Sequence, residues 1–159
     1  MGAHHGVIRR IAAADVRPLR QRVLRPNQGF ESTLYPGDEA PSAVHLGAFD
    51  GERLVGIVSL YRESRPGAPP GDTARGWRLR GMATASEARG QGHGRELLAA
   101  CTDHVAGSGG GELWCNARLP AVGFYRGAGF AVVGDEFEVD GIGPHVVMLR
   151  DVPSPVPTG

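Results

Sequence analysis

A run of alternating glycine and polar residues is the part of the sequence best suited to chemistry. Residues 89–94 read Arg-Gly-Gln-Gly-His-Gly, and the apolar periodicity of a helix starts directly after them. Glycine lets a backbone turn tightly and lets a ligand approach it closely. The first N–H groups of a helix lack internal partners and lie at the positive end of the helix dipole. Together these features predict a binding site for a phosphate or pyrophosphate group.

Two common classes of phosphate-binding loop do not fit these residues. A P-loop needs Lys and then Ser or Thr after its last glycine, whereas Gly94 is followed by Arg95 and Glu96. A dinucleotide-binding loop needs G-x-G-x-x-G after the first strand of a βαβ unit, and here the third glycine comes one residue early. The pattern that remains is R-x-x-G-x-G, formed by Arg89, Gly92 and Gly94.

The length and composition predict one globular domain. The chain has 159 residues, of which 41% are hydrophobic and 21% are charged, enough for a single hydrophobic core. Its 17 basic and 17 acidic residues cancel, so no overall charge favours nucleic acid or a membrane surface. We expect the domain to span residues 6–151 and a Pro-rich, disordered tail to follow at 152–159.

The cysteines and the absence of long apolar segments indicate in which cellular compartment the protein is expected. Cys101 and Cys115 each lie in an apolar segment. Two cysteines make neither a disulfide framework nor a zinc site, so we expect buried free thiols and no metal. Residues 1–6 contain no apolar signal region, and no segment approaches the ~20 apolar residues of a membrane span. These features predict a cytoplasmic protein with no membrane partner.

Hydrophobic periodicity predicts an alternation of strands and helices. We expect strands at 6–12, 43–49, 53–61, 77–84, 112–116, 130–139 and 145–149, and helices at 13–25, 92–106 and 120–126. Asp50-Gly51-Glu52 between two apolar runs predicts a hairpin. Residues 27–42 are expected to form a loop with one helical turn, and the Pro-rich residues 62–75 a second, mobile loop. The pattern predicts an α+β fold with one mostly antiparallel sheet flanked by helices.

A second motif lies downstream of the glycine loop, at residues 121–130. It reads Ala-Val-Gly-Phe-Tyr-Arg-Gly-Ala-Gly-Phe and resembles the A-x-x-F/L-Y-x-x-x-G-F of the GNAT superfamily of acyl-CoA-dependent N-acyltransferases. The R-x-x-G-x-G loop between a strand and a helix resembles the other signature of that superfamily. The resemblance extends over roughly residues 6–151. The alternative is that the glycines only turn the chain into a tightly packed helix.

The resemblance implies a GNAT-like sheet and an acetyl-CoA cofactor, with coenzyme A as the product. The pyrophosphate would bind backbone N–H groups of the loop, and the pantetheine chain would run beside residues 82–84 much as an added strand does. Arg118 stands where many family members have asparagine, and Asn116, two residues earlier, is the candidate that remains. The candidate cofactor-binding residues are Met82, Ala83, Thr84, Arg89, Gly90, Gln91, Gly92, His93, Gly94, Arg95, Asn116 and Tyr125.

Acyl transfer to an amine requires three groups around the thioester. The amine, with a pKa of about 10.4 in a lysine-like substrate, must lose its proton to a base or a water chain. The carbonyl oxygen needs a donor about 3 Å away, which we expect from backbone N–H groups around Met82 and Ala83. The leaving thiolate needs a proton, and the resemblance implies that Tyr125 donates it. The alternative is a tyrosine that packs in the core.

Several residues are candidates for the base. His145 opens the last predicted strand, and its ordinary pKa of about 6.5 suits proton uptake at neutral pH. The alternatives are an inert strand residue at this position and a water chain with no single base. We expect Cys115 to be a buried thiol rather than a nucleophile. The other ionisable residues considered are His45, Glu87, Glu112 and Glu138.

The acceptor is expected to bind segments 27–42, 62–75 and 137–145. Acidic residues there would suit a cationic amine, but loops are usually polar, so no substrate follows from them. These residues are Glu31, Asp38, Glu39, Asp72, Glu136, Glu138 and Asp140. The sequence thus predicts an N-acetyltransferase for a small or peptide amine, with no nucleic-acid partner and with homodimer formation left open. A non-catalytic acyl-CoA-binding or regulatory module and a hydrolase of phosphorylated substrates are the alternatives.

Overall fold

The computed structural model describes residues 7–69 and 75–155. The strands are β1 (Val7–Ile11), β2 (Val44–Asp50), β3 (Arg53–Arg62), β4 (Gly76–Thr84), β5 (Gly111–Arg118), β6 (Ala131–Val139) and β7 (Gly143–Val152). The α-helices are α1 (Ala13–Leu19), α2 (His93–Gly107) and α3 (Val122–Gly127). Short helical turns lie at Arg20–Leu24, Phe30–Thr33, Ser86–Ala88 and Leu119–Ala121.

The strands join in one mixed sheet. Its seven strands have the order β1-β2-β3-β4-β5-β7-β6. Strands β4 and β5 pair in parallel, whereas β1–β2, β2–β3, β5–β7 and β6–β7 are antiparallel pairs. The predicted α+β fold with a mostly antiparallel sheet is therefore confirmed.

The described residues form two compact units. The first comprises residues 7–61 and 79–101, and the second comprises residues 62–69, 75–78 and 102–155. Parts of three predicted segments lie outside the described residues: the N-terminus at 1–6, residues 70–74 of the Pro-rich loop, and residues 156–159 of the tail.

In the first unit, the predicted hairpin forms between β2 and β3. Asp50 pairs with Arg53, so the loop has two residues, Gly51 and Glu52. Gly51 has φ +63°, as the first central residue of a type II′ turn requires. The apolar run that follows is a buried central strand from Val55 onward. The Asp-Gly signal thus predicts both the position and the tightness of the turn.

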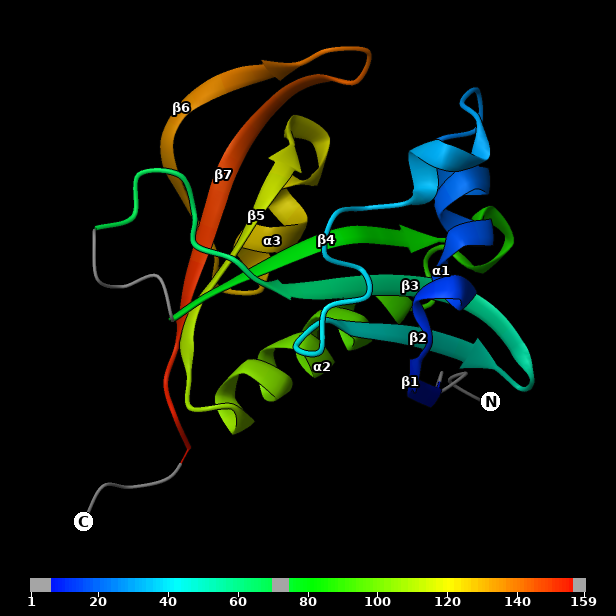
Figure 1. Ribbon diagram of the computed structural model, residues 1–159, viewed down its shortest axis with the longest axis horizontal. Coiled ribbons are helices and arrows are strands. Elements are labelled where there is room, and N and C mark those ends of the chain that lie inside the picture. Colours follow the sequence, from blue (N-terminus) through cyan, green and yellow to red (C-terminus); the bar gives the residue numbers. More distant parts are fainter. Residues whose placement is uncertain (1–6, 70–74, 156–159) are drawn as a thin grey trace. The chain divides into compact units, whose positions relative to one another are not determined.

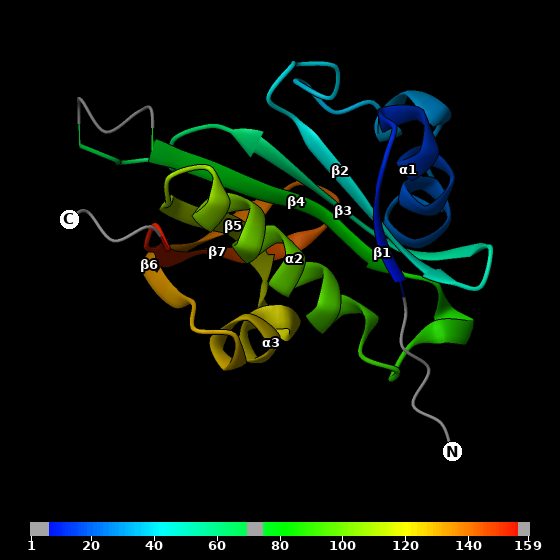
Figure 2. The same ribbon diagram turned by 90° about the horizontal axis from the view of Figure 1, so that it is seen from below.

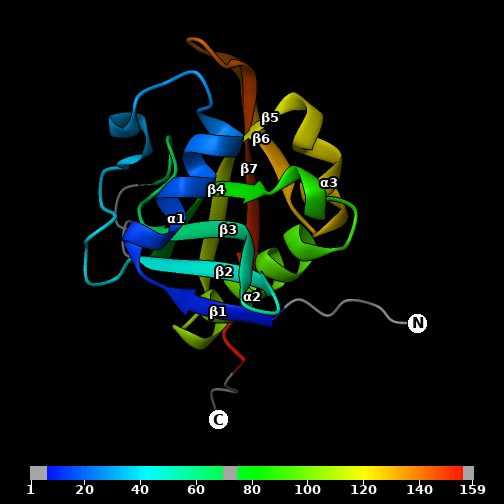
Figure 3. The same ribbon diagram turned by 90° about the vertical axis from the view of Figure 1, so that its right-hand side faces the viewer.

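Helices α1 and the first part of α2 cover opposite faces of strands β1–β4 in this unit (Figures 2 and 3). Ile57 packs with Val16 and Leu19 of α1 in one hydrophobic cluster. Its neighbour Gly56 faces the other way, and a Cβ there would lie 3.1 Å from Leu97 of α2. Successive strand residues point to opposite faces, so β3 is buried on both sides and reads as a continuous apolar run.

The first predicted helix is shorter than expected. The sequence predicts a helix over 13–25, whereas α1 ends at Leu19 and a π-helical turn continues over Arg20–Leu24. Pro18 lies inside α1 and has no N–H to bond to the preceding turn. The Arg25 N–H bonds to the Arg20 carbonyl at 2.9 Å, which is the wider spacing of a π-turn. The Arg20 side chain in this turn is fully buried.

The second unit is built on strands β5, β7 and β6 (Figure 1). Strand β5 pairs with β7 along its whole length, from Gly111 to Arg118. The β6–β7 pairing shifts register between Val133 and Phe137, where Gly134 has φ +79°. Helix α3 begins after a turn that holds Pro near its start, and a glycine with positive φ follows it. The predicted proline before this short helix and glycine after it are therefore confirmed.

Candidate active site

The glycine loop is exposed and open. Gly90 has φ +80° and Gly92 has φ +86°, a region that side chains with a Cβ rarely enter. Apart from its chain neighbours, no heavy atom of residues 7–69 and 75–155 lies within 4 Å of where a Cβ would sit at either glycine. Residues 89–92 are all exposed. These glycines are therefore required by the turn of the backbone and not by close packing against the rest of the protein.

Helix α2 begins at the end of this loop. The Glu96 N–H bonds to the Gly92 carbonyl at 3.0 Å and closes the first helical turn. The N–H groups before Glu96 therefore precede the intrahelical bonds, as at every helix start. They lie at the positive end of a helix that is 15 residues long. This arrangement suits a phosphate or pyrophosphate group.

The side chains of the loop differ in burial and in hydrogen bonding. His93 is 1% exposed, and within the described residues neither of its ring nitrogens has a hydrogen-bond partner. The ring of His93 is therefore not exposed at the surface of the loop. Arg89 Nε donates to the Thr84 carbonyl at 3.4 Å and ties the loop to the end of β4, and Arg95 is exposed.

Strand β4 contains an irregularity before the predicted pantetheine segment. Gly81 has φ +70° inside the strand. A glycine in this conformation marks a bulge or a close approach of two backbones. A Cβ there would lie 3.3 Å from the Tyr35 ring. Met82 and Thr84 follow as half-buried residues on either side of the buried Ala83.

Asn116 lies on β5 in the second unit. Its Oδ1 atom is buried and has no hydrogen-bond partner within the described part of the chain. A buried polar atom is normally paired, so an unpaired one calls for a ligand or water. The Oδ1 atom is therefore a candidate acceptor for a ligand N–H group, and its contact with a pantetheine amide stays a prediction.

Tyr125 lies on α3 with 7% of its surface exposed. Its ring contacts Phe124 and Phe130 edge to face, at centroid distances of 5.1 and 5.4 Å. The hydroxyl donates a hydrogen bond to the Cys115 sulfur. The tyrosine is thus packed in the core with its hydroxyl bonded to a thiol of the protein, and its role as a proton donor stays a prediction.

Both cysteines are buried free thiols, as predicted. Burial raises the pKa of Cys115 to about 12, despite the opposing hydrogen bond from Tyr125. Burial also raises the pKa of Cys101. Because the thiolate is the nucleophile, a thiol that stays protonated at neutral pH is a poor one. The expectation that Cys115 is not a nucleophile therefore agrees with its surroundings.

His145 lies near the start of β7 and is 6% exposed. Its Nδ1 atom is 2.9 Å from the Gly143 carbonyl oxygen, which can only accept, so Nδ1 carries the proton. In the neutral ring this leaves Nε2 as the basic nitrogen. The Phe137 ring lies beside the imidazole at a centroid distance of 5.8 Å.

Three of the other candidate bases are engaged in contacts of their own. Glu87 pairs with Arg22 and Arg53, and the hydrogen bond from Arg22 lowers its pKa to about 2. Glu112 pairs with Arg65 at 3.2 Å. Both nitrogens of His45 are bonded, as described below. Glu138, opposite Pro144 in the β6–β7 pairing, is exposed.

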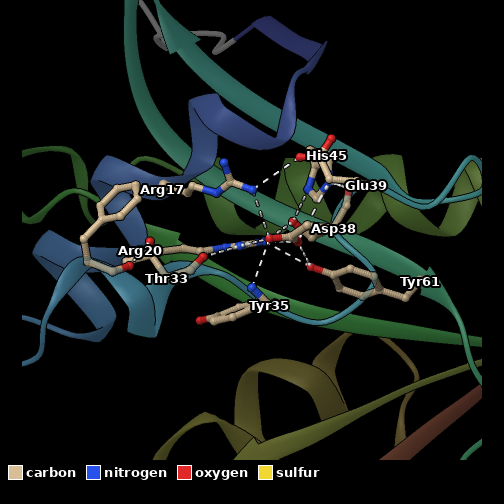
Figure 4. Close-up of polar contacts among 10 residues, drawn as sticks. Arg17, Arg20, Thr33, Tyr35, Asp38, Glu39, His45 and Tyr61 are labelled. Carbon is tan, nitrogen blue, oxygen red and sulfur yellow. Dashed lines mark hydrogen bonds and ion pairs between the residues drawn. The ribbon is translucent and has the colours of Figure 1, made fainter.

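A group of buried polar side chains inside the first unit was not predicted (Figure 4). We call it the Arg20–Asp38 cluster. Arg20 is 0% exposed and donates to both carboxylate oxygens of Asp38, from Nη1 at 2.8 Å and from Nη2 at 3.1 Å. The cluster consists of Arg20, Thr33, Tyr35, Asp38, His45, Ser59 and Tyr61.

The remaining contacts join a loop to two strands. Arg20 Nη1 donates to the Thr33 carbonyl at 2.8 Å, and the Tyr35 N–H donates to Asp38 Oδ2 at 3.1 Å. Arg20 Nη2 also reaches Ser59 Oγ and Tyr61 OH of β3, each at 3.0 Å. The residue 27–42 segment is therefore fastened to β3 through one guanidinium group.

His45 of β2 completes the cluster. Its Nε2 atom is 2.9 Å from the Asp38 carbonyl oxygen, so Nε2 donates, and Nδ1 lies 2.7 Å from Ser59 Oγ. A ring with both nitrogens bonded has no lone pair left for an acceptor amine. The candidate role of His45 as a base therefore finds no support in its contacts.

The charges of the cluster are stable near neutral pH. Burial alone would raise the pKa of Asp38, but hydrogen bonds from Arg20 and Tyr61 hold it below its ordinary value. Burial alone would lower the pKa of Arg20, but Asp38 and neighbouring groups raise it. Burial and the hydrogen bond to Asp38 raise the pKa of Tyr61 to about 12. The ion pair stays charged and the phenol stays neutral.

One sequence signal points to this cluster. Arg20 follows Val16 by four residues and therefore falls on the apolar face of the predicted helix. A charged residue on an apolar face must find a partner when the face is buried. The partner, Asp38, lies 18 residues away in a segment without periodicity.

Comparison with known proteins identifies the family of this chain. Residues 27–150 match the family described as acetyltransferase (GNAT) domain. The uncharacterized N-acetyltransferase YitI of Bacillus subtilis is 36% identical over 143 residues, which are 90% of this chain and 94% of YitI. The chain therefore belongs to the GNAT acetyltransferase family and is an N-acetyltransferase.

Solved structures with low sequence identity share the fold. The ribosomal-protein-S18-alanine N-acetyltransferase of Escherichia coli has a TM-score of 0.74 at 14% identity, and the match covers 98% of this chain and 99% of that one. An aminoglycoside 6′-N-acetyltransferase in complex with coenzyme A has a TM-score of 0.72 at 17% identity, and the match covers 95% and 99% of the two chains.

Two features are absent from the described residues. No helix among residues 7–69 and 75–155 is long and apolar enough to cross a membrane. Over the same residues, no three His, Cys, Asp or Glu side chains gather as metal ligands would.

Proposed function

We propose that this chain transfers an acetyl group from acetyl-CoA to a primary amine, which attacks the thioester directly. The observation that carries the proposal is the open loop at Gly90 and Gly92, set directly before the start of a 15-residue helix. A pyrophosphate is the ligand that such a start suits. Family membership supports acyl transfer, and one structural neighbour was solved with coenzyme A.

The chain offers three sets of groups to acetyl-CoA, which supplies an activated acyl group as a thioester. The pyrophosphate binds the backbone N–H groups from Gln91 to Arg95. In the first unit, residues 82–84 of β4 offer backbone groups to the pantetheine chain. In the second unit, Asn116 offers its buried Oδ1, which lacks a partner within the described residues, as an acceptor for an amide N–H group. The thioester carbonyl takes a hydrogen bond from the backbone near Met82.

Two side chains give and take the protons. Tyr125 gives its hydroxyl proton to the leaving thiolate, because a phenol and a thiol have similar basicity. To do so the hydroxyl turns away from the Cys115 sulfur to which it donates in this structure. His145 takes the proton of the amine at Nε2, since Nδ1 is bonded to the Gly143 carbonyl. Coenzyme A is then the product, together with the acetylated amine.

The first test combines binding and turnover. Wild-type protein is titrated with coenzyme A by calorimetry, and thiol release from acetyl-CoA is followed over a panel of primary amines. We expect binding and turnover. Tight binding with no turnover on any amine would contradict the enzyme and support a non-catalytic acyl-CoA-binding module. No binding of coenzyme A at all would overturn the cofactor site itself.

Tyr125→Phe tests the proton donor. We expect kcat to fall about 100-fold, at the lower end of what general acid–base catalysis contributes. Coenzyme A affinity should stay within about fivefold of wild type, because a hydroxyl hydrogen bond is worth about 1 kcal/mol or less here. An unchanged kcat with a normal melting temperature would show that Tyr125 only packs the core.

A further inference from the structure

Three side chains lie in a row across the strands of the second unit. The Cα pairing places Arg118 of β5 directly opposite His145 of β7, and His145 directly opposite Phe137 of β6. Residues paired in this way in antiparallel strands point to the same face, with Cβ atoms about 5 Å apart. The contact between the rings of His145 and Phe137 agrees with this placement. The three side chains therefore share one face of the sheet.

The face that carries this row is the one that points away from helix α3. Cys115 of β5 accepts a hydrogen bond from Tyr125 of α3, so its side chain points to the helix. The β5–β7 pairing is regular here, and successive strand residues point to opposite faces, so Asn116 and Arg118 both point the other way. The buried Oδ1 of Asn116, which has no partner among the described residues, thus lies on the face of the row. An unpaired polar atom there indicates that a ligand or water binds this face.

His145 offers one accessible nitrogen on this face. Its Nδ1 donates to the Gly143 carbonyl at 2.9 Å. Over residues 7–69 and 75–155, Nε2 has no hydrogen-bond partner, and it is not enclosed by the protein as both ring nitrogens of His93 are. A ligand can therefore reach His145 Nε2 directly.

Arg118 is exposed and has no partner of its own. Within the part of the chain that the structure describes, its side chain makes no hydrogen bond, ion pair or ring contact. Other arginines of the second unit are paired, since Arg65 binds Glu112 at 3.2 Å and Arg78 binds Glu63 at 3.3 Å. The guanidinium donors of Arg118 are therefore available to a ligand beside His145.

We propose that the acceptor carries an anionic group, a carboxylate or a phosphate, close to its amine, and that Arg118 binds this group while His145 takes the proton of the amine. The proposal rests on the acetyltransferase function and narrows its substrate class. Because Arg118 and His145 are direct neighbours across two strands, the anion and the amine are a few bonds apart. The planar guanidinium binds a carboxylate or phosphate through two parallel hydrogen bonds, which also orients the amine.

Matched acceptor pairs test the charge directly. Free amino acids are compared with their carboxamides, and 2-aminoethyl phosphate with ethanolamine, in the thiol-release assay. Replacing the carboxylate by an amide lowers the pKa of the neighbouring amine, so intrinsic reactivity near neutral pH favours the amide. We expect wild type to prefer the anionic member of a pair in kcat/KM, which assigns the preference to binding. The pair that shows it distinguishes carboxylate from phosphate.

A longer acceptor tests the distance between the two groups. In 6-aminohexanoate the carboxylate lies further from the amine than in an α-amino acid. We expect 6-aminohexanoate to be preferred over its own carboxamide less strongly than an α-amino acid is over its carboxamide. An equal preference would show that the charge acts at long range, and would overturn a contact next to His145.

Arg118→Gln tests the residue. We expect kcat/KM for the anionic members to fall about 10-fold, as loss of a hydrogen bond to a charged group does, and the neutral members to be little affected. Arg118→Lys, which keeps the charge without the planar fork, should retain part of the preference. The matched control is Arg126→Gln, which removes another exposed arginine of the same unit, on α3, and should leave the preference unchanged. Equal losses for both members of a pair, or no loss, would overturn the proposal.

Binding is measured separately from turnover, by saturation-transfer NMR with coenzyme A present. Wild type should bind the anionic member of a pair, and Arg118→Gln should bind it more weakly while keeping its calorimetric affinity for coenzyme A. Loss of that affinity would assign Arg118 to the cofactor and overturn the inference.

The same measurements separate this inference from the proposed function. If wild type binds coenzyme A but neither binds nor acetylates the anionic members better than the neutral ones, the inference fails and the acetyltransferase proposal stands. If wild type does not bind coenzyme A, the acetyltransferase proposal fails, and this inference with it.

Discussion

The glycine loop and the Arg20–Asp38 cluster belong to the same unit and are both rich in hydrogen-bonding groups, but their surroundings are opposite. At Gly90 and Gly92 the space around the backbone is open, and helix α2 starts with N–H groups that need partners. In the cluster, the Arg20 guanidinium is fully buried and makes five hydrogen bonds to four residues.

This contrast distinguishes a binding feature from a stabilising one. Donors that the fold leaves unpaired at an open surface are available to a ligand, whereas donors saturated inside the protein hold segments together. Arg20 Nε, a buried donor with no partner within the described residues, is the exception inside the cluster. We therefore expect changes in the loop to affect cofactor binding, and changes in the cluster to affect stability first.

Gly92→Glu should have the largest effect. A carboxylate in the loop fills the open space and repels a pyrophosphate, and a residue with a Cβ is strained at φ +86°. We expect coenzyme A affinity to fall at least about 100-fold by calorimetry, which corresponds to roughly 2.7 kcal/mol. The control is Gly134→Glu, because Gly134 is equally open and has φ +79°. Unchanged affinity in a folded Gly92→Glu protein would contradict the cofactor site.

Asp38→Ala should be the most damaging change in the cluster. It leaves the Arg20 charge buried without its partner, which typically costs about 3–5 kcal/mol of unfolding free energy. Urea unfolding measures the loss of unfolding free energy. If Asp38→Ala does not fold, Asp38→Asn, which has nearly the same side-chain shape, is measured instead. Coenzyme A affinity of the folded protein should change little. Loss of coenzyme A affinity at unchanged stability would show that the cluster acts in binding rather than in stability.

Tyr61→Phe should have a smaller effect that depends on pH. The folded-state pKa of Tyr61 is about 12, above the ordinary value of 10. The unfolded chain ionises first, so this contribution to stability is complete below pH 10 and is lost as the pH rises towards 12. In the variant, the fall in unfolding free energy over this window should be less steep by at most about 1.4 kcal/mol per pH unit.

Few other groups interfere with this measurement between pH 10 and 12. The chain contains no lysine that would titrate there, and both cysteines are present in wild type and variant alike. Urea unfolding at pH 9, 10 and 11 gives the slopes. Parallel slopes for the two proteins would show that the Tyr61 pKa does not differ between the folded and unfolded chain.

Much of the fold follows from local signals. The apolar run after Arg53 becomes β3, and Gly51 forms the expected turn. Helix α3 lies between its predicted proline and glycine, although the preceding turn is 3₁₀ rather than α. The first helix was predicted too long, because the periodicity continues through Arg20–Leu24 while the backbone changes to a π-turn.

Less of the candidate site follows from such signals. The glycine loop and the motif around Tyr125 are contiguous in sequence, so both could be found by spacing. The contacts of His45 and Glu87 could not, because the partners are far away along the chain: Ser59 is 14 residues from His45, and Arg22 is 65 residues from Glu87. These contacts decide which candidate bases are engaged.

The sequence by itself determined the strands, the helix starts, the turn at Gly51 and the open glycine loop before α2, because each depends on periodicity or on what glycine allows over a few residues. The tertiary structure alone decided that Asp38 neutralises Arg20, and that Arg80 stacks on Tyr35. Those pairings depend on which residues meet after folding, and burial then sets their strength. A charge in a loop sequence therefore does not reveal whether it serves a ligand or another residue of the protein.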